Sequence, residues 1–457
     1  VAVGDSSTPT PHDLPVVDMR GSTIMPGMVV ASTGIAGRHS GDESISGLYN
    51  AIDAFDRFGD YRTLLASGIT TVHLDPGDHR LVSGAGAVVR LSGHWNQRVL
   101  NAASDVTVNL SRVSRNPPNL LDPLTSPAAD NLIVPAQPQR PSSRMEEWPA
   151  LRDALQKPEG KETSAHLLAL RRLWDAELPM RVQALDSTDA IRAIELFDLA
   201  DRAGYLVGSF DLDPVASMIS TTGTAFVYGL GMPLRGSAPD LGENPRSSDP
   251  DLSVLNSMDR SKLALSVARG VPLGDLRLAA ATAVRSGLDR DLILRALTSN
   301  PASILGVADH VGSLAPGRLA DFVVLSDHPL ATSAAVNRVY MNGHLAYRAQ
   351  TGNSVVVRAG TVWSGPNEYL RDAEVLVTDG KIVEVGSRVA RPRGATVIDA
   401  GREGFVVPGF IDGRGHLGLA GDRSATGTNL DLSSLVGVPG PAETRVAMGG
   451  VTSMVVS

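Results

Sequence analysis

Two segments far apart in this 457-residue chain carry the same landmarks in the same order. Pro26-Gly27 and Pro408-Gly409 each precede an apolar run, and Gly68-Ile69-Thr70 and Gly450-Val451-Thr452 follow them. The spacing from proline to glycine is 42 positions in both segments (68 − 26 and 450 − 408). A single offset of 382 (408 − 26) therefore superimposes them, and so long a period indicates a duplicated domain rather than a solenoid repeat.

The same offset places Val1–Gly4 on Val383–Gly386. We therefore expect the first copy to begin partway into the repeated unit, and the second to stop partway through it at Ser457. On this interpretation the true N terminus is missing, which leaves the compartment open because targeting signals are N-terminal.

Composition excludes several classes of partner. The net charge is −8 and no strongly basic block occurs, which argues against nucleic acid. No run of about 18 apolar residues occurs, so we expect a soluble protein without a membrane span. The chain contains no cysteine, which excludes disulfides and thiolate metal sites.

The middle of the chain alternates between strand and helix patterns. Leu178–Ala184 is typical of a buried strand, Asp186–Tyr205 has apolar residues at helical spacing, and Leu206–Phe210 resembles the next strand. A strand–helix–strand unit of this length implies parallel pairing. Several such units in series predict an α/β fold, a TIM-type (β/α)8 barrel.

Strands and tight turns dominate the segments on both sides of this region. A helix over Asp289–Thr298 is followed by Asn300-Pro301, where we expect Asn300 to cap the next helix. Asn342-Gly343 and Asp379-Gly380 have the composition of hairpin turns. We therefore expect the two flanking segments to pair into a small composite β-sandwich.

These patterns predict five segments. They are β-sandwich residues 1–27, a barrel over 28–306, returning sandwich strands over 307–350, the β-sandwich of copy 2 over 354–407, and the first strands of a truncated second barrel over 408–457. Residues 115–149 are rich in proline and serine and are expected to form a long irregular insertion of unassigned role.

Three motifs resemble those of a known family. Thr298–Gly306 followed by Val311–Leu325 resembles the C-terminal signature of the amidohydrolase superfamily, in its imidazolonepropionase-like branch. Val407–Asp412 resembles that family's entry into barrel strand 1. The resemblance covers nearly the whole chain and implies a metal-dependent hydrolase of carbon–nitrogen (non-peptide) bonds.

The resemblance also implies a ligand set. Active relatives hold one or two divalent metals, such as zinc, at the carboxyl end of the barrel, where the metal activates a water. Two histidines in an H-x-H pattern come from strand 1, further histidines come from strands 5 and 6, and an aspartate comes from strand 8.

The first copy departs from that set at each matched position. The H-x-H positions fall on Ser32 and Gly34, and the strand-5 position falls on Gln183. Strand 6, Leu206–Phe210, has no histidine, and the strand-8 position falls near Ala268. These residues do not make a zinc shell, so the first barrel is expected to be catalytically degenerate and to need no cofactor.

The second copy retains part of the set. Arg414 occupies the first H-x-H position and His416 the second. An arginine stays cationic and repels a metal, so His416 is a candidate ligand beside an unfavourable neighbour.

His73, Asp75 and His79 lie at the end of a predicted strand, where barrel active sites form. They are either a relocated metal or proton-transfer site or polar turn residues. The glycine-rich segment Pro76–Arg90 is expected to be a loop.

Three more polar residues have competing interpretations. Asp211 and Asp213 follow a strand and either face the barrel mouth or form a solvated turn, which is favoured. Arg90 either binds a carboxylate ligand or forms a surface salt bridge, which is favoured.

Three functions therefore remain open: a hydrolase whose chemistry lies in the second barrel, a non-catalytic structural or ligand-binding module, and an enzyme that acts without the family's metals. The partners that these allow are a small-molecule ligand and the rest of the second amidohydrolase domain. The sequence does not identify the substrate or the oligomeric state.

Three geometric expectations follow from the register. Ser32, Gly34 and Gln183 should cluster at the barrel mouth near strand 8. Val355–Val362 and Ala373–Val385 should complete the sandwich of the first copy by pairing with Leu319–Leu325 and Arg338–Arg348, because unpaired strand edges invite pairing. Residues 408–457 should pack loosely or as an appendage.

Overall fold

The structure is a computed structural model of the chain. It describes residues 16–17, 19–37, 43–115, 141–155, 164–231, 252–349, 354–365, 368–378, 380–392, 395–415 and 450–456. The chain divides into two compact units, Val1–Gly231 with Asp249–Ala349 and Met232–Ser248 with Gln350–Ser457. No helix within the described ranges has the length and apolar character needed to cross a membrane.

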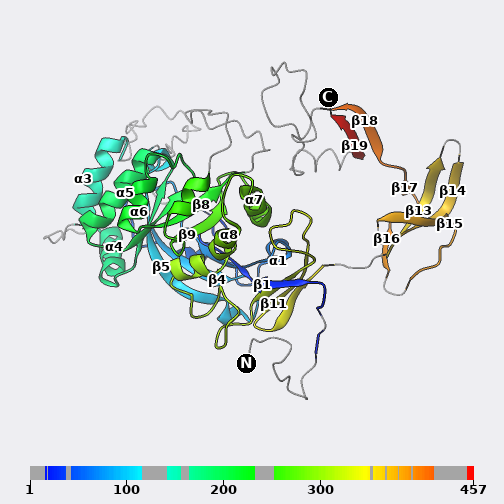
Figure 1. The fold of residues 1–457 in the computed structure, drawn as a ribbon, viewed down its shortest axis with the longest axis horizontal. Coiled ribbons are helices and arrows are strands. Elements are labelled where there is room, and N and C mark those ends of the chain that lie inside the picture. The colour runs from blue at the N-terminus through cyan, green and yellow to red at the C-terminus, as the bar shows by residue number, and fades with distance from the viewer. Residues whose placement is uncertain are drawn as a thin grey trace, which may run out of the picture. The chain divides into compact units, whose positions relative to one another are not determined.

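An eight-stranded sheet forms a nearly closed barrel in the first unit (Figure 1). Its strands, in spatial order, are β2 (Met28–Val30), β3 (Ile69–Leu74), β4 (Val82–Arg90), β5 (Val99–Asn109), β6 (Met180–Ala184), β7 (Gly204–Gly208), β8 (Ala225–Leu230) and β9 (Leu263–Val267). The Ser266 hydroxyl of β9 donates to the carbonyl of Ser32, just beyond β2, at 3.0 Å. This contact joins the two ends of the sheet, and the predicted α/β barrel is confirmed.

Strand β4 breaks the parallel pattern, because it runs antiparallel to both β3 and β5. The expectation that Pro76–Arg90 forms a loop holds for Pro76–Leu81 but was wrong for Val82–Arg90, which is β4. Its glycines fit a buried strand approached closely by other groups: a β-carbon on Gly84 would overlap the carbonyl of Tyr49. Nine consecutive buried positions in β4 place this strand inside the molecule.

Helices pack around the barrel sheet (Figure 1). They are α1 (Arg62–Ala66), α2 (Arg112–Arg115), α3 (Arg144–Leu155), α4 (Ala165–Asp175), α5 (Ser187–Ala200), α6 (Ala216–Thr222), α7 (Leu276–Ala283), α8 (Arg290–Leu297) and α9 (Ser299–Ile304), with 3-10 turns at Ala51–Ala54, Trp95–Gln97, Leu252–Ser257 and Leu273–Asp275. Helix α3 begins within the predicted 115–149 insertion, whose residues 116–140 lie outside the described ranges.

Helix α5 shows how sequence sets these elements. The Asp186 side chain accepts from the Asp189 backbone N–H at 2.8 Å, which caps the helix, and Asp201 ends it with φ 45°. Buried Ile194 and Phe197 form part of its inner face. The strand–helix–strand prediction for this region is confirmed, with β7 beginning two residues earlier than expected.

The cap predicted at Asn300 was wrong. Helix α9 begins at Ser299, and Asn300 lies inside it. The buried Asn300 amide donates to the carbonyls of Arg260 and Leu263, both at 2.7 Å. Asn300 therefore joins α9 to the start of β9 instead of capping its own helix.

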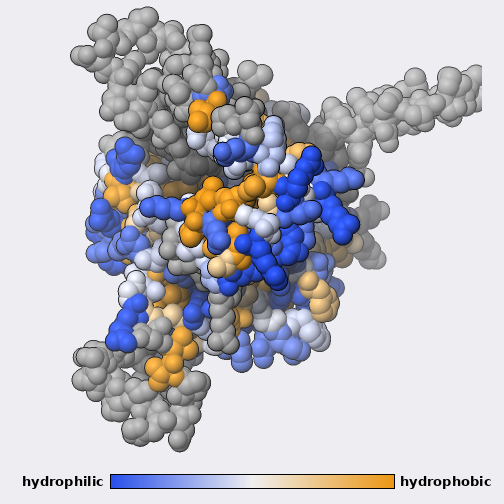
Figure 2. Space-filling view, turned by 90° about the vertical axis from the view of Figure 1, so that its right-hand side faces the viewer, coloured by the Kyte–Doolittle hydropathy of each residue, from blue (hydrophilic) through white to orange (hydrophobic). Residues whose placement is uncertain are grey.

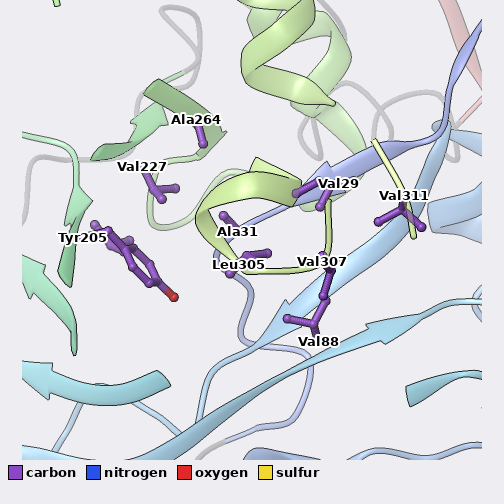
Figure 3. Packing of buried hydrophobic residues seen from close by; sticks show 11 residues of the cluster. Val29, Ala31, Val88, Tyr205, Val227, Ala264, Leu305, Val307 and Val311 are labelled. Atoms are coloured by element: carbon purple, nitrogen blue, oxygen red, sulfur yellow. The ribbon is translucent and has the colours of Figure 1, made fainter. Parts of the chain in front are cut away.

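An apolar cluster fills the barrel wall where α9 meets the first and last strands (Figure 3). Its buried members are Val29, Ala31, Val88, Tyr205, Val207, Val227, Ala264, Ala302, Leu305, Val307 and Val311. In Figure 3, Leu305 and Val307 lie between the β2 residues and Val88 of β4. Tyr205 contributes its ring to this cluster and carries the one polar group among these side chains.

The two flanking segments of the first unit pair with each other, as predicted. The sheet order is β1 (Thr23–Pro26), β10 (Phe322–Leu325), β11 (Val336–Met341) and β12 (His344–Arg348). Asn342 and Gly343 make the β11–β12 turn with φ 52° and 76°. Positive φ at both central residues is what the asparagine–glycine pair predicts.

The second unit has its own five-stranded sheet, formed by β13 (Ser354–Gly365), β14 (Glu368–Thr378), β15 (Lys381–Gly386), β16 (Thr396–Asp399) and β17 (Phe405–Val406). Among the described residues, its strands hydrogen-bond to one another and not to β10–β12. The predicted completion of the first copy's sandwich by Val355–Val385 was therefore wrong, because β14 pairs along both edges within its own sheet. Figure 2 shows apolar residues gathered on the surface that faces the viewer. Within the second unit, Ile382, Ile398 and Phe405 are exposed.

The last two strands, β18 (Phe410–Gly415) and β19 (Val451–Val456), form a parallel pair. Phe410 pairs with Val451 as Met28 pairs with Ile69 in the barrel, and both differences equal 382 (410 − 28 and 451 − 69). The Phe410 N–H donates to the Gly450 carbonyl at 2.8 Å, and Met28 donates to Gly68 at 3.0 Å. The same offset thus relates both the sequence landmarks and the strand pairing.

Candidate functional site

A buried polar cluster crosses the barrel interior, and Asp105 of β5 lies at its centre. Its Oδ2 receives hydrogen bonds from His73 Nε2 at 2.6 Å, Ser104 Oγ at 2.5 Å and Tyr205 Oη at 3.1 Å. Thr107 Oγ1 donates to Oδ1 at 3.2 Å. Side chains of β3, β5 and β7 therefore converge on one fully buried carboxylate.

Arg181 of β6 extends this cluster towards the carboxyl ends of the strands. Its Nη2 lies 2.7 Å from Asp75 Oδ2, after β3, and donates to Ser32 Oγ, after β2, at 2.8 Å. The residue is fully buried. One guanidinium therefore links three strands across the interior.

The electrostatics of the cluster favour the charged forms of Asp105 and Arg181 and the neutral form of Tyr205. Burial opposes ionisation of Asp105, but His73 and Arg181 outweigh it and lower the pKa of this carboxyl below its usual value. Burial likewise opposes the charge of Arg181, but Asp75 raises the pKa of its guanidinium. Burial, followed by Asp105, raises the pKa of the Tyr205 hydroxyl well above its usual value. The tyrosine therefore remains a proton donor to Asp105.

The glycine in β4 beside this cluster is required by its packing. A β-carbon on Gly86 would overlap His73 Nε2 and lie 2.7 Å from Asp105 Oδ1. The glycine therefore lets β4 approach the His73–Asp105 pair closely.

The positions matched to family metal ligands have other roles here. Ser32 is held between Arg181 of β6 and Ser266 of β9. Gly34 is exposed, and its carbonyl accepts from the Gly37 N–H in a turn. Gln183 is half-buried in β6, and its carbonyl accepts from Leu110. Strand β7 carries no histidine, as the sequence shows.

The alternative metal ligands at the end of β3 each interact with another side chain. His73 pairs with Asp105, Asp75 pairs with Arg181, and His79 Nε2 lies 3.6 Å from Asp78. Within the described ranges, no three His, Cys, Asp or Glu side chains are grouped so that they could hold a metal ion. The side chains described at these positions therefore do not fit the metal that the family resemblance implies.

The environment of Arg90 differs from the surface salt bridge that was expected. Arg90 is 1% exposed, and it forms a two-point contact with Asp321, Nε to Oδ2 at 2.7 Å and Nη2 to Oδ1 at 2.5 Å. The favoured surface salt bridge was therefore wrong, because the pair is buried. Asp321 also accepts from the Asn342 N–H at 2.6 Å, and its carbonyl accepts from Gly27. The pair thus connects β4 to both flanking segments of the four-stranded sheet formed by β1, β10, β11 and β12, hereafter the small sheet.

The remaining candidates lie at turns or outside the described side chains. Asp211 and Asp213 are exposed, and the Asp213 N–H donates to Asp211 Oδ1 at 3.3 Å, in the favoured turn. Arg414 lies in β18, in the part of that strand whose side chains are not described, and His416 lies outside the described ranges.

Sequence reasoning missed Asp105, Arg181 and Tyr205, which build the cluster. A charged residue in the middle of a buried strand was the available signal for Arg181, because such a residue needs an interior partner. Asp105 and Thr107 alternate with buried Val106 and Val108, so they face the opposite side of β5.

Comparison with known proteins gives an independent assignment. Residues 249–362 match the model of the amidohydrolase family. An imidazolonepropionase of Mycolicibacterium smegmatis is 45% identical over 71 residues, which is 16% of this chain and 18% of that protein. An adenine deaminase of Carboxydothermus hydrogenoformans is 37% identical over 83 residues, 18% of this chain and 13% of that protein. The aligned regions thus span less than a fifth of these relatives.

The fold comparison covers much more of the chain. The crystal structure of an amidohydrolase from Thermotoga maritima superimposes with a TM-score of 0.59 at 22% identity, over 76% of this chain and 92% of that one. At this identity the similarity concerns the fold. The motifs, the match of residues 249–362 and the barrel fold together support the amidohydrolase superfamily, in its imidazolonepropionase-like branch, and a relation to hydrolases of carbon–nitrogen bonds.

Proposed function

We propose that the first barrel is a catalytically degenerate amidohydrolase domain that serves as a structural or ligand-binding module. Hydrolysis of a carbon–nitrogen bond, where the protein performs it, belongs to the second copy. The supporting observation is the contact between Arg181 Nη2 and Ser32 Oγ at 2.8 Å. The Arg181 guanidinium is permanently cationic and is hydrogen-bonded to Ser32, the first expected ligand position, so it opposes binding of a divalent ion there.

The other matched positions support the same proposal. Gly34 has no side chain to donate, and a carboxamide such as that of Gln183 is a weak zinc ligand compared with imidazole or carboxylate. The repeated strand pairing of β18 and β19 supports a second unit of the same kind. The zinc or other divalent metal of active relatives would then be a cofactor of that second unit.

Elemental analysis of the purified chain tests this proposal. After dialysis against excess zinc and then metal-free buffer, we expect less than about 0.1 zinc, manganese or iron per chain from the first barrel, because bound metal needs deprotonated ligands of suitable type.

A His416→Ala variant separates the two copies in this measurement. Metal that is present in the unsubstituted chain and lost in His416→Ala belongs to the second copy and leaves the proposal standing. About one metal per chain that persists in His416→Ala and is lost in His73→Ala or Asp75→Ala would overturn it.

A further inference from the structure

We infer that Glu147 is a proton-operated latch that holds α2 and α3 against the start of α5 when it is protonated and loosens them when it ionises. This inference goes beyond the proposed function and does not depend on it. The latch lies on the side of the barrel where β5 leads into α2 and β6 leads into α5.

The geometry of the latch is a shared arginine. Glu147 is fully buried, and its Oε1 lies 3.1 Å from Arg115 Nη1, which also lies 3.4 Å from Asp189 Oδ1. Arg115 is the last residue of α2, Glu147 belongs to α3 and Asp189 belongs to α5. Three helices therefore meet at one guanidinium nitrogen.

The other charged groups at this junction are already paired. Arg144 Nη2 lies 2.6 Å from Asp186 Oδ2 and 2.9 Å from Asp189 Oδ1. Arg192 Nη1 of α5 donates to the Arg144 carbonyl at 3.2 Å. On α3 itself, Glu146 Oε2 accepts from the Ser142 backbone N–H at 2.7 Å. Glu147 thus shares its cation, Arg115, with a second buried carboxylate.

Two carboxylate oxygens at this junction lack hydrogen bonds. Glu147 Oε2 and Asp189 Oδ2 are both buried and have no partner among the described residues. An ionised carboxylate is unfavourable when one of its buried oxygens accepts no hydrogen bond, so such a group tends to take up a proton instead. Protonation of Glu147 removes the repulsion between its carboxylate and that of Asp189. The Arg115 guanidinium then forms its ion pair with Asp189 alone.

The titration falls in an accessible range. The pKa of Glu147 is raised to about 7, chiefly by burial. The nearby charge of Asp189 raises it further, and Arg115 partly opposes the increase. The folded pKa is above the ordinary value of 4.5, so the docked state holds its proton more tightly than the open state. Docking is therefore strongest below pH 4.5 and weakens as the pH rises towards 7.

Hydrogen exchange of α3 tests the latch. After correction for the intrinsic pH dependence of amide exchange, protection over residues 144–155 should fall about tenfold between pH 6 and pH 8, relative to β6 and β7 in the same molecule. The Glu147→Gln variant should lose this pH dependence, because its side chain does not titrate. Glu195→Gln, an exposed substitution on α5, is the matched control and should retain it.

A second variant guards against a substitution that merely disturbs folding. Asp189→Asn removes the like charge that raises the Glu147 pKa, so the midpoint of the protection change should move to lower pH. The inference is overturned if corrected protection of α3 in the unsubstituted chain is the same at pH 6 and pH 8. It is also overturned if Glu147→Gln keeps the full pH dependence, or if Asp189→Asn leaves the midpoint in place.

Discussion

Arg90→Met should lower the free energy of unfolding of the first unit by about 3–5 kcal/mol, the usual cost of removing one partner from a buried ion pair. The substitution keeps most of the apolar volume of the side chain but leaves the Asp321 carboxylate buried and facing no cation. Asp321 also fixes Asn342 and Gly27, so the loss should extend to the small sheet. Urea denaturation followed by circular dichroism measures this change.

A double-mutant cycle shows whether the pair itself is responsible. Asp321→Asn retains an acceptor for the Asn342 N–H, and Arg90→Met with Asp321→Asn should lose less than the sum of the two single changes. Arg285→Met, at an exposed arginine, is the control and should change stability by less than about 0.5 kcal/mol. Additive losses in the cycle would contradict the assigned role of the pair.

Arg181→Met should have a comparable effect, again about 3–5 kcal/mol at neutral pH, because it leaves Asp75 buried without its cation. Its distinguishing feature is a pH dependence. Arg181 is one of the groups that lower the pKa of Asp105, so its removal raises that pKa. The difference between variant and unsubstituted chain should therefore shrink as the pH falls towards 4, because Asp105 takes up a proton at higher pH in the variant than in the unsubstituted chain.

Exposed Arg172 on α4 offers the control, since Arg172→Met removes a positive charge from the surface alone. Thermal unfolding of the three proteins between pH 4 and pH 8 provides the comparison. A stability loss in Arg181→Met that stays constant over this range would show that lost packing, rather than an uncompensated carboxylate, explains the effect.

The barrel and the small sheet could be predicted because their signals are local. The α5 segment carries a cap residue and apolar spacing within a single element, and Asn342-Gly343 specifies its own turn. The strand identity of Val82–Arg90 could not be predicted in this way. Its glycines indicate a loop unless one knows that His73 and Asp105 need the space beside Gly86.

The candidate site was harder to predict because its partners are distant in sequence. Arg90 and Asp321 are 231 residues apart, and Arg181 and Ser32 are 149 apart. Family matching located Ser32 at the end of β2, but it gave no reason to look at Arg181. The sandwich error has a related origin, since an exposed strand edge does not specify which of two similar partners fills it.

Anomalous diffraction at the zinc edge, from crystals grown with excess zinc, shows directly whether the interior of the first barrel holds a metal. We expect no zinc peak there and continuous density for Arg181 between Ser32 and Asp75. A peak bonded to His73, Asp75 or Gln183, with the Arg181 guanidinium displaced, would contradict this expectation.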